Sequence, residues 1–462
     1  LTLGSLSAPK RDQPHLQALE SKAAEYGEVA QTIWSYAELG YQEEQSSALL
    51  QSTLESEGFT IEKGVAGIPT AFLATFGSGG PTVGILAEYD ALPGLSQKAV
   101  PYKISNDGRG GHACGHHLFG TASTAAAIAV KNYLKKSGKK GTIKLFGCPA
   151  EEGGSGKVYM TRAGLFDDLD VALHWHADSK NSAGIRPALA NKSAKFRFYG
   201  IAAHAAGAPE MGRSALDAVE AMNTMVNMMR EHVTDDTRIH YVITRGGEAP
   251  NVVPDFAEVY YYSRHSTRDE VIRVFDRIVD AARGAALGTG TTMEYEMIGG
   301  THELLYIPSL KKRMHQNISR IGCYPSITSE KDLAEEISKT LNRKLNTEFI
   351  EGVVPYETPE KPGGSTDVGD VSFAVPTAGM RAATWVPGTP AHSWQAVAAG
   401  GTSIGEKGMM VAAKTLALTA MQLMDDAAFR AQIKKEFIET RGAEFNYIPL
   451  LGDREPALDY RN

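Results

Sequence analysis

Short apolar segments that end in acidic or metal-ligating side chains recur along the chain, and they constrain its fold more than any other feature. Apolar runs of this length are typical of strands buried on both faces of a sheet. Ligands of open α/β sheets bind at the ends of such strands, so these polar side chains are expected to meet at one edge. The segments are 82–87, 142–147, 170–173 and 383–386, which lead to Asp90, to the pair Glu151 and Glu152, to His176 and to His392.

The stretch 111–117, Gly-His-Ala-Cys-Gly-His-His, adds a thiol and three imidazoles between two of these segments. Thiolate and imidazole groups are ligands of borderline transition metals. Cys114 and His116 are two residues apart, a spacing that lets a single turn hold one ion. The alternative is a helix N-terminus with a buried thiol, because cysteine often serves as a small buried hydrophobe. The repetition of ligand-type side chains at several strand ends favours the metal site.

The candidate ligands outnumber the needs of a single ion. One ion of the zinc type takes about four protein ligands, or three and a water, so this larger set indicates two ions. A thiolate can bridge two ions, and Cys114 is assigned that role. Two such ions can polarise a carbonyl and activate a shared water, which leaves one carboxylate free to act as general base. The full set is Asp90, Cys114, His116, Glu151, Glu152, His176 and His392.

The middle of the chain follows a different pattern. Strand-like and helix-like segments there alternate in the order β-α-β-β-α-β, which is the ferredoxin-like arrangement. Helix patterns return beyond residue 303, and two helices are predicted within residues 13–57. The sequence therefore predicts a small domain inserted in a larger one. The segments of the insertion are 193–199, 213–233, 237–244, 255–262, 269–287 and 291–297.

Composition and charge argue against several classes of protein. The 462 residues are 42% hydrophobic and 22% charged, as in soluble globular chains of two or three domains. The net charge of −7 disfavours general nucleic-acid binding, and no apolar run approaches the roughly 18 residues of a membrane span. Three cysteines give no disulfide framework, and no signal-peptide pattern is visible at the start. We expect a cytoplasmic protein with neither nucleic-acid nor membrane partners.

The motifs of this chain resemble a known family. The stretches 112–116 (His-Ala-Cys-Gly-His) and 149–153 (Pro-Ala-Glu-Glu-Gly), with the downstream His176 and His392, are similar to the motifs of the dinuclear metal amidohydrolases. That family includes the aminoacylases and the indole-3-acetyl-amino-acid hydrolases. The resemblance covers nearly the whole chain, and its further motifs lie at 88–94, 148–157, 212–218 and 364–371.

The resemblance implies an α/β architecture in two parts. A mixed-sheet catalytic domain with helices on both faces would comprise residues 1–189 and 303–462, and a ferredoxin-like α+β lid or dimerisation domain would comprise residues 190–302. It also implies two divalent ions per protomer, Zn²⁺ or Mn²⁺, because mixed thiolate, imidazole and carboxylate ligands admit both. The implied metal ligands are Cys114, His116, Glu152, His176 and His392.

The remaining polar residues of the motifs take supporting roles in the same comparison. Glu151 would be the general base, and Asp90 would orient a metal ligand. His204 resembles a histidine that reaches the active site of a partner protomer and stabilises the oxyanion. Asn251 and Arg264 resemble substrate-positioning residues, and Arg264 could pair bidentately with a substrate carboxylate. The alternatives are a turn for Asn251 and a surface ion pair for Arg264.

One position departs from the family pattern. Many relatives carry an aspartate directly after the second ligand histidine, whereas this chain has His117. An added imidazole could ligate metal, bind substrate by a hydrogen bond or have no role, and His117 is included here among the candidate substrate-binding residues. The change bears on the substrate more than on the reaction.

The implied reaction is hydrolysis of the amide bond of an N-acyl amino acid. Aryl-acyl groups on an acidic amino acid, as in p-aminobenzoyl-glutamate, are the expected substrates. A water that bridges the metals would attack the carbonyl, and Glu151 would take its proton and pass it to the leaving amine. A dipeptidase or an aromatic-amine hydrolase on the same scaffold is the alternative, and the intact ligand set argues against a non-catalytic metal-binding protein. The expected assembly is a homodimer through the inserted domain, and the other partner considered is a related second subunit.

Overall fold

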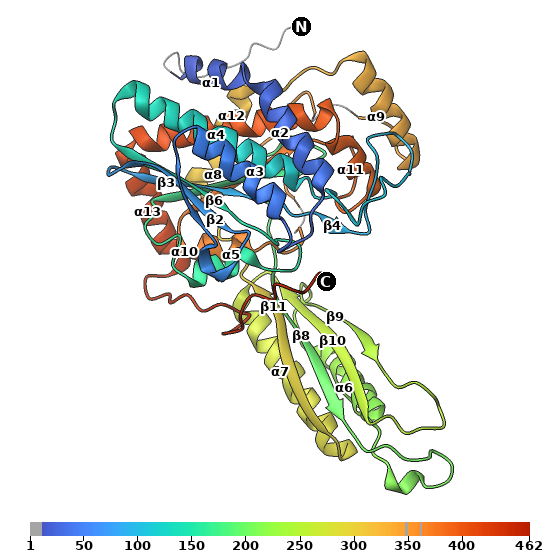
Figure 1. The fold of residues 1–462 in the computed structure, drawn as a ribbon. Coiled ribbons are helices and arrows are strands. Elements are labelled where there is room, and N and C mark those ends of the chain that lie inside the picture. Colours follow the sequence, from blue (N-terminus) through green and yellow to red (C-terminus); the bar gives the residue numbers. More distant parts are fainter. Residues whose placement is uncertain (1–11, 347–349, 361–362) are drawn as a thin grey trace.

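The computed structural model describes residues 12–346, 350–360 and 363–462, which form a larger α/β body and a narrower arm (Figure 1). The chain enters the arm at strand β8 (Ala190–Tyr199) and leaves it after β11 (Thr292–Thr301). The arm is therefore an insertion between two parts of the body. The domain boundaries at residues 190 and 302 stay a prediction.

A six-stranded mixed sheet forms the centre of the body. Its strand order is β1-β2-β6-β3-β7-β12, in which β6, β3, β7 and β12 are parallel and β1 and β2 add antiparallel pairs at one edge. The four parallel strands deliver their C-terminal ends to the same edge, where the sequence analysis expects the polar side chains. The strands are β1 (Thr60–Lys63), β2 (Phe72–Ser78), β3 (Thr82–Ala87), β6 (Gly141–Gly147), β7 (Val171–Asp178) and β12 (Thr377–Ala383).

Helices cover both faces of this sheet, as predicted. Side chains alternate along β3, so that Ile85 packs in the large core under α4 and α12 while Leu86 packs against α5 and α10 on the other face. None of the described helices is both long and apolar enough to cross a membrane. The helices of the body are α1 (Gln13–Glu20), α2 (Ala23–Tyr36), α3 (Glu44–Ser56), α4 (His116–Ser137), α5 (Gly156–Arg162), α8 (Pro308–Ile321), α9 (Thr328–Thr340), α10 (Val368–Ala374), α11 (Trp394–Gly400), α12 (Ser403–Asp425) and α13 (Ala427–Arg441).

The arm has the predicted β-α-β-β-α-β order. Its four strands form an antiparallel sheet in the order β11-β8-β10-β9, and both helices pack on that sheet around a hydrophobic core of its own. Strand β9 is at one edge of this sheet. The remaining elements of the arm are α6 (Ala215–Met229), β9 (Arg238–Arg245), β10 (Phe256–His265) and α7 (Arg268–Thr289).

The structure corrects several predicted element bounds. Three helices, not two, lie within residues 13–57, and the break between α1 and α2 falls where the Ser21 hydroxyl donates to the Ala18 carbonyl and competes with helical bonding. Strand β7 continues beyond residue 173, so His174 and His176 lie inside the strand rather than after it. The polar side chains of β7 share one face of the strand. Because they interrupt the apolar run, the sequence pattern predicts the end of the strand too early.

Candidate active site

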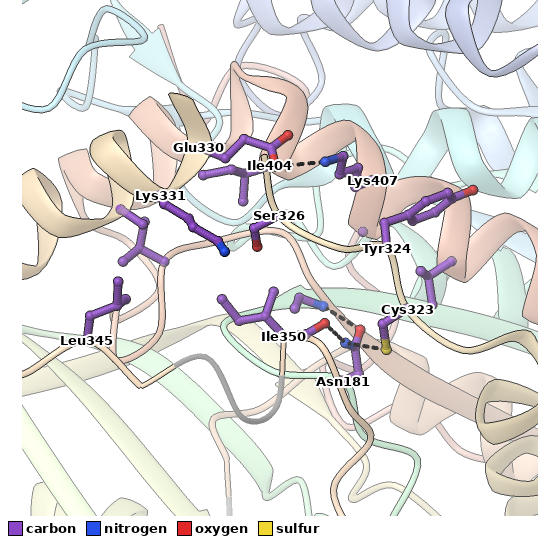
Figure 2. Close-up of a pocket in the computed structure, with 15 residues that line it drawn as sticks. Asn181, Cys323, Tyr324, Ser326, Glu330, Lys331, Leu345, Ile350, Ile404 and Lys407 are labelled. Atoms are coloured by element: carbon purple, nitrogen blue, oxygen red, sulfur yellow. Dashed lines mark hydrogen bonds and ion pairs between the residues drawn. The ribbon is translucent and has the colours of Figure 1, made fainter. Parts of the chain in front are cut away.

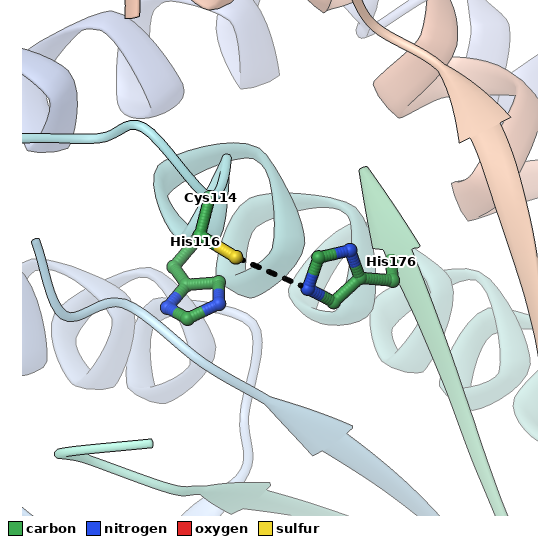
Figure 3. A group of neighbouring side chains, drawn as sticks. All are labelled: Cys114, His116 and His176. Atoms are coloured by element: carbon green, nitrogen blue, oxygen red, sulfur yellow. Dashed lines mark hydrogen bonds between the residues drawn. The ribbon is translucent and has the colours of Figure 1, made fainter. Parts of the chain in front are cut away.

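Two groups of potential metal ligands share one thiol at the C-terminal edge of the body sheet. Cys114, His116 and His176 bring one ligand atom each within 4.8 Å of one another (Figure 3), and Cys114, Glu152 and His392 form a second such group. The thiol Sγ of Cys114 lies 3.4 Å from Nε2 of His176. The fold thus brings together all five residues that the sequence analysis assigns as ligands.

Close backbone contacts hold this cluster in place. Gly115 precedes α4 with a φ of +76°, and a Cβ at this position would lie 2.4 Å from the Cβ of Ala177 on β7. Only glycine therefore lets the thiol-bearing turn approach the strand that carries His176. His392 has a φ of +60°, unusual for a residue with a side chain. Its backbone N–H donates to the Ala113 carbonyl at 3.0 Å, which ties the late loop to the early motif.

Asp90 fixes the orientation of the His116 ring through its Nδ1 nitrogen. Its Oδ1 lies 2.8 Å from Nδ1 of His116, and its Oδ2 accepts the backbone N–H of Glu152 at 2.9 Å. Burial acts to raise the pKa of Asp90, but the neighbouring imidazole and these hydrogen bonds outweigh it and hold the pKa below its ordinary value. The arrangement leaves Nε2 of His116 facing the other ligands, as a metal ligand requires.

Glu151 lies in the same cluster, and its carboxylate is surrounded by other carboxylates. It forms a group with His116 and Glu152 whose ligand atoms lie within 4.8 Å of one another. Burial, followed by the carboxylates of Glu88 and Glu152, raises the pKa of Glu151 well above its ordinary value. Carboxylates crowded in this way call for a compensating cation or proton.

The donor set fits a divalent cation. Nε2 of His116 and Oε2 of Glu88 are buried and 3.1 Å apart, yet their geometry gives no hydrogen bond, so both are left without a hydrogen-bond partner among the described residues. Thiol, imidazole and carboxylate groups are the ligands that zinc-type ions take. A cation at this edge would satisfy buried donor atoms that the described part of the chain leaves unsatisfied.

A buried ion-pair network, which is not predicted from the sequence, supports the site. Nζ of Lys157 lies 2.6 Å from Oε1 of Glu88 and 2.8 Å from Oδ1 of Asp367, and all three side chains are buried. Lys157 also donates its backbone N–H to Asp367 at 2.9 Å. The three residues belong to motifs quoted for the family resemblance, but their charges gave no sign that they would meet.

The structure does not bring His117 to the cavity. Its ring is fully buried, with Nε2 3.0 Å from the Gly400 carbonyl and the ring centroid 4.8 Å from that of His112. Burial lowers the pKa of His117 to about 3, although the hydrogen bond to Gly400 opposes this. The expectation that His117 binds substrate is therefore corrected: in α4 it points into the body, on a different side from His116, and ties α4 to α11.

The candidate residues of the arm fall into two places. Arg264, near the end of β10, donates from Nη1 to Oγ of Ser365 at 3.4 Å, and Ser365 lines the cavity of the metal ligands. His204 and Asn251 are exposed on two loops that pair with each other, since Ala205 N–H donates to the Asn251 carbonyl at 3.0 Å. These loops lie at the end of the arm away from the body (Figure 1), so neither residue reaches the cavity of its own chain.

A second, smaller pocket lies between α9 and α12 (Figure 2). Several of its polar side chains contact one another: Lys407 lies 2.7 Å from Glu330, and Asn181 donates to Sγ of Cys323 at 3.2 Å. Asn181 also accepts the backbone N–H of Ala383 at 2.9 Å. These contacts support the end of β12 and give the pocket a structural role.

Comparison with known proteins decides the family. The model described as Peptidase family M20/M25/M40 matches residues 84–421. The chain belongs to this peptidase family. As an M20/M25/M40 member it is a metal-dependent hydrolase, and the resemblance to the metal amidohydrolases is confirmed.

Relatives of this M20/M25/M40 chain include enzymes that differ in their named substrates. It is 40% identical to the B subunit of p-aminobenzoyl-glutamate hydrolase from Escherichia coli K12, over 94% of this chain and 96% of that protein. It is 31% identical to the Xaa-Arg dipeptidase of Mus musculus, over 91% and 90% of the two chains. The first of these activities is the one predicted from the sequence, and the dipeptidase is the predicted alternative.

Two solved bacterial structures share the fold. A dinuclear metal binding peptidase of Bacillus subtilis superposes with a TM-score of 0.59 at 18% identity, covering 88% of this chain and 99% of that one. The aminobenzoyl-glutamate utilization protein of Klebsiella pneumoniae gives a TM-score of 0.62 at 20% identity, covering 88% and 97%. At these identities the likeness concerns the fold alone.

Proposed function

We propose that this chain hydrolyses the amide bond of N-acyl amino acids, with p-aminobenzoyl-glutamate as the representative substrate. The observation that carries the proposal is the pair of ligand groups that share Cys114, with Glu151 beside them. The 40% identity to the B subunit of p-aminobenzoyl-glutamate hydrolase, over nearly the full length of both chains, supports the substrate.

Two divalent ions, Zn²⁺ or Mn²⁺, are part of the proposal. His116 and His176 would help to hold one ion and Glu152 and His392 the other, and Cys114 belongs to both groups of ligand atoms. When bound, such ions polarise a carbonyl and make water nucleophilic at neutral pH. Asp90 would keep His116 in the tautomer that presents Nε2. The Lys157 ammonium offsets the charge of Glu88 next to the site.

Glu151 would carry out the proton transfers of the reaction. Glu151 would accept a proton from the attacking water and deliver it to the amide nitrogen, so that the amine can leave. Arg264, next to Ser365 at the cavity, would pair with the α-carboxylate of the substrate. These roles divide the substrate into a reacting carbonyl near Cys114 and an anchored amino acid near the arm.

A homodimer through the inserted domain, residues 190–302, completes the proposed site. His204 and Asn251 are exposed on loops far from their own cavity, so they would serve the cavity of a second copy. Edge strand β9 exposes apolar side chains, with Val242 at 55% and Ile243 at 40% exposure, as a surface for pairing. The alternative partner is a related second subunit, since the A subunit of the Escherichia coli hydrolase is 31% identical over 50% of this chain. A cytoplasmic location remains part of the proposal.

The test is hydrolysis by the metal-loaded enzyme. Protein stripped of metal and reloaded with Zn²⁺ or Mn²⁺ is offered p-aminobenzoyl-glutamate, and release of p-aminobenzoate and glutamate is followed by chromatography. Activity that depends on the added ion and vanishes in Glu151→Gln supports the proposal. Cleavage of dipeptides ending in arginine, with none of p-aminobenzoyl-glutamate, would instead support the dipeptidase that the mouse relative suggests.

A further inference from the structure

The cavity of the metal ligands continues into a region of positive charge that no role assigned so far explains. Besides Cys114 and His176, it is lined by Arg186, Arg381 and Lys311. Of the four carboxylates that line the cavity, Glu88, Glu151 and Glu152 belong to the metal-ligand cluster and its ion pairs, and Asp178 is paired with Arg186 and Arg381. We name Arg186, Arg381 and Lys311 the cationic subsite.

Lys311 is the most unusual member of the subsite. Its side chain comes from α8 and is buried, with an exposure of 6%, yet it lies along the cavity wall. Nζ donates to the Gly379 carbonyl at 2.7 Å and has no carboxylate within ion-pair distance among the described residues. An ammonium has three N–H donors, so two remain for a ligand. A buried cation without an anionic partner is rare, because its desolvation is uncompensated.

Arg186 and Arg381 share a single carboxylate as their ion-pair partner. Nη1 of Arg186 and Nε of Arg381 both lie 3.2 Å from the same oxygen of Asp178. Within the described part of the chain the other N–H groups of both guanidiniums have no hydrogen-bond partner, so they can bind a ligand at the cavity. Glu360, the other carboxylate whose charge acts on Arg381 and Lys311, is itself paired with Lys180 at 3.2 Å. Among the described residues, positive charge is therefore in excess here, and the region has room for a further negative charge.

The sheet places the cationic subsite next to the metal ligands. Arg381 on β12 pairs in register with His176 on β7, and Gly379 pairs with His174. His174 and His176 share a strand face and lie about 7 Å apart. A Cβ on Gly379 would lie 2.4 Å from the His174 ring, so glycine lets that ring lie over β12. Nε2 of His174 is buried without a hydrogen-bond partner among the described residues and adds a polar group to the subsite.

We propose that Lys311, Arg381 and Arg186 bind a carboxylate of the substrate that lies away from the scissile amide. This inference rests on the proposed function and sharpens it, because Arg264, which contacts Ser365 at the cavity, would already take the α-carboxylate. The preferred substrates would then carry two carboxylates. The second one belongs either to the side chain of the amino acid or to the far end of the acyl group, and a cationic side chain in this position would be repelled.

Matched substrate pairs distinguish these two sources. N-benzoyl-glutamate and N-benzoyl-glutamine differ in a side-chain carboxylate, and N-(4-carboxybenzoyl)glycine and N-(4-carbamoylbenzoyl)glycine differ in an acyl carboxylate. The metal-loaded wild-type enzyme should favour the acid over the amide in one pair, by about tenfold to a hundredfold in kcat/KM. Lys311→Met should abolish that preference, and Arg186→Gln should reduce it. Lys312→Met, an exposed neighbour on the same helix, is the control and should retain it.

The outcome that overturns the subsite is an unchanged acid-to-amide ratio in Lys311→Met for both pairs. Absence of hydrolysis of every compound would contradict the proposed function, and binding then tests the subsite by itself. In calorimetry with the metal-loaded protein, wild type should bind the acid more tightly than the amide in one of the two pairs, and Lys311→Met should bind both members of that pair equally. Equal binding of acid and amide by wild type in both pairs would overturn the inference.

Discussion

Asp90 and His116 form a fully buried pair in which Oδ1 and Nδ1 lie 2.8 Å apart. The carboxylate receives the ring N–H and leaves the opposite nitrogen, Nε2, directed at Cys114 and His176. Carboxylate partners of this kind fix the tautomer and the orientation of metal-ligating histidines. The relationship makes Asp90 a positioning residue for the metal site.

Asp90→Asn should weaken metal binding. The amide can present either a donor or an acceptor to His116, so the required tautomer is no longer enforced, and a loss of about tenfold to a hundredfold in metal affinity is expected. Competition with a chromophoric chelator measures that affinity directly. Asp453→Asn, at an exposed site in the C-terminal segment, is the control. Equal affinities of wild type and Asp90→Asn would contradict the positioning role.

Glu151→Gln should separate metal binding from turnover. The amide keeps the size and hydrogen bonding of the carboxylate but cannot take a proton, so kcat should fall by about two to four orders of magnitude. Metal content per chain, measured by mass spectrometry of the metals, should stay at the wild-type value. Glu439→Gln, exposed on α13, provides the comparison. Retained turnover in Glu151→Gln would refute the role of Glu151 as the general base.

Lys157→Met should destabilise the whole body. The substitution leaves Glu88 and Asp367 buried without their shared cation, and breaking a buried pair in this way costs about 3–5 kcal/mol. Urea denaturation followed by circular dichroism gives the free energy of unfolding. The exposed Lys434→Met on α13 should change it by less than about 0.5 kcal/mol. A similar small effect for both variants would show that the network adds no stability.

Lys311→Met should stabilise the free protein near neutral pH. Burial and the neighbouring Arg381 lower the pKa of Lys311 to about 7, although Glu360 opposes this, and His174 and His315 add no anion to the surroundings. The unfolded chain takes up a proton as the pH falls below the ordinary lysine pKa of 10.5, whereas the folded chain does so only near 7. Folded stability is therefore lost between these two values as the pH falls.

Replacing the Lys311 amine with the uncharged side chain of methionine should abolish this pH-dependent loss of folded stability. The gain for Lys311→Met should be about 4 kcal/mol at pH 7 and shrink to about 1 kcal/mol at pH 10. Unfolding by urea at both pH values, with Lys312→Met as reference, measures the difference. A gain that does not change with pH would contradict the burial of an uncompensated amine. A subsite that binds substrate at the expense of stability is a common property of functional sites.

Mixing two inactive variants should restore activity if His204 acts across a dimer. A site needs Glu151 from one chain and His204 from the other, so a heterodimer of Glu151→Gln and His204→Ala holds one complete site. Random exchange of protomers in equal amounts should recover roughly a quarter of wild-type activity. Refolding the mixture and assaying it tests this, and the unmixed variants are the controls. No recovery in a sample shown to be dimeric would refute the role in trans.

Several features of the site were predictable because they are local in sequence. Cys114 and His116 lie on one turn, and Glu151 and Glu152 follow one strand, so their proximity needs no tertiary information. The meeting of His176 and His392 with them was predicted from the rule that parallel strands end at one edge. His117 was misassigned because sequence does not tell on which side of α4 the ring lies. In the structure it packs against Gly400, a residue far along the chain.

The sequence by itself determined the types of ligand, their order, the α/β class with its inserted β-α-β-β-α-β unit, and through its motifs the M20/M25/M40 family. Periodicity and motif chemistry are carried by neighbouring residues, and for that reason they can be read from the chain. Only the tertiary structure decided that Lys157 meets Glu88 and Asp367, and that Lys311, Arg381 and Arg186 face one cavity. Those contacts join distant segments, and the packing of helices on the sheet, rather than any local pattern, sets which charges are buried together.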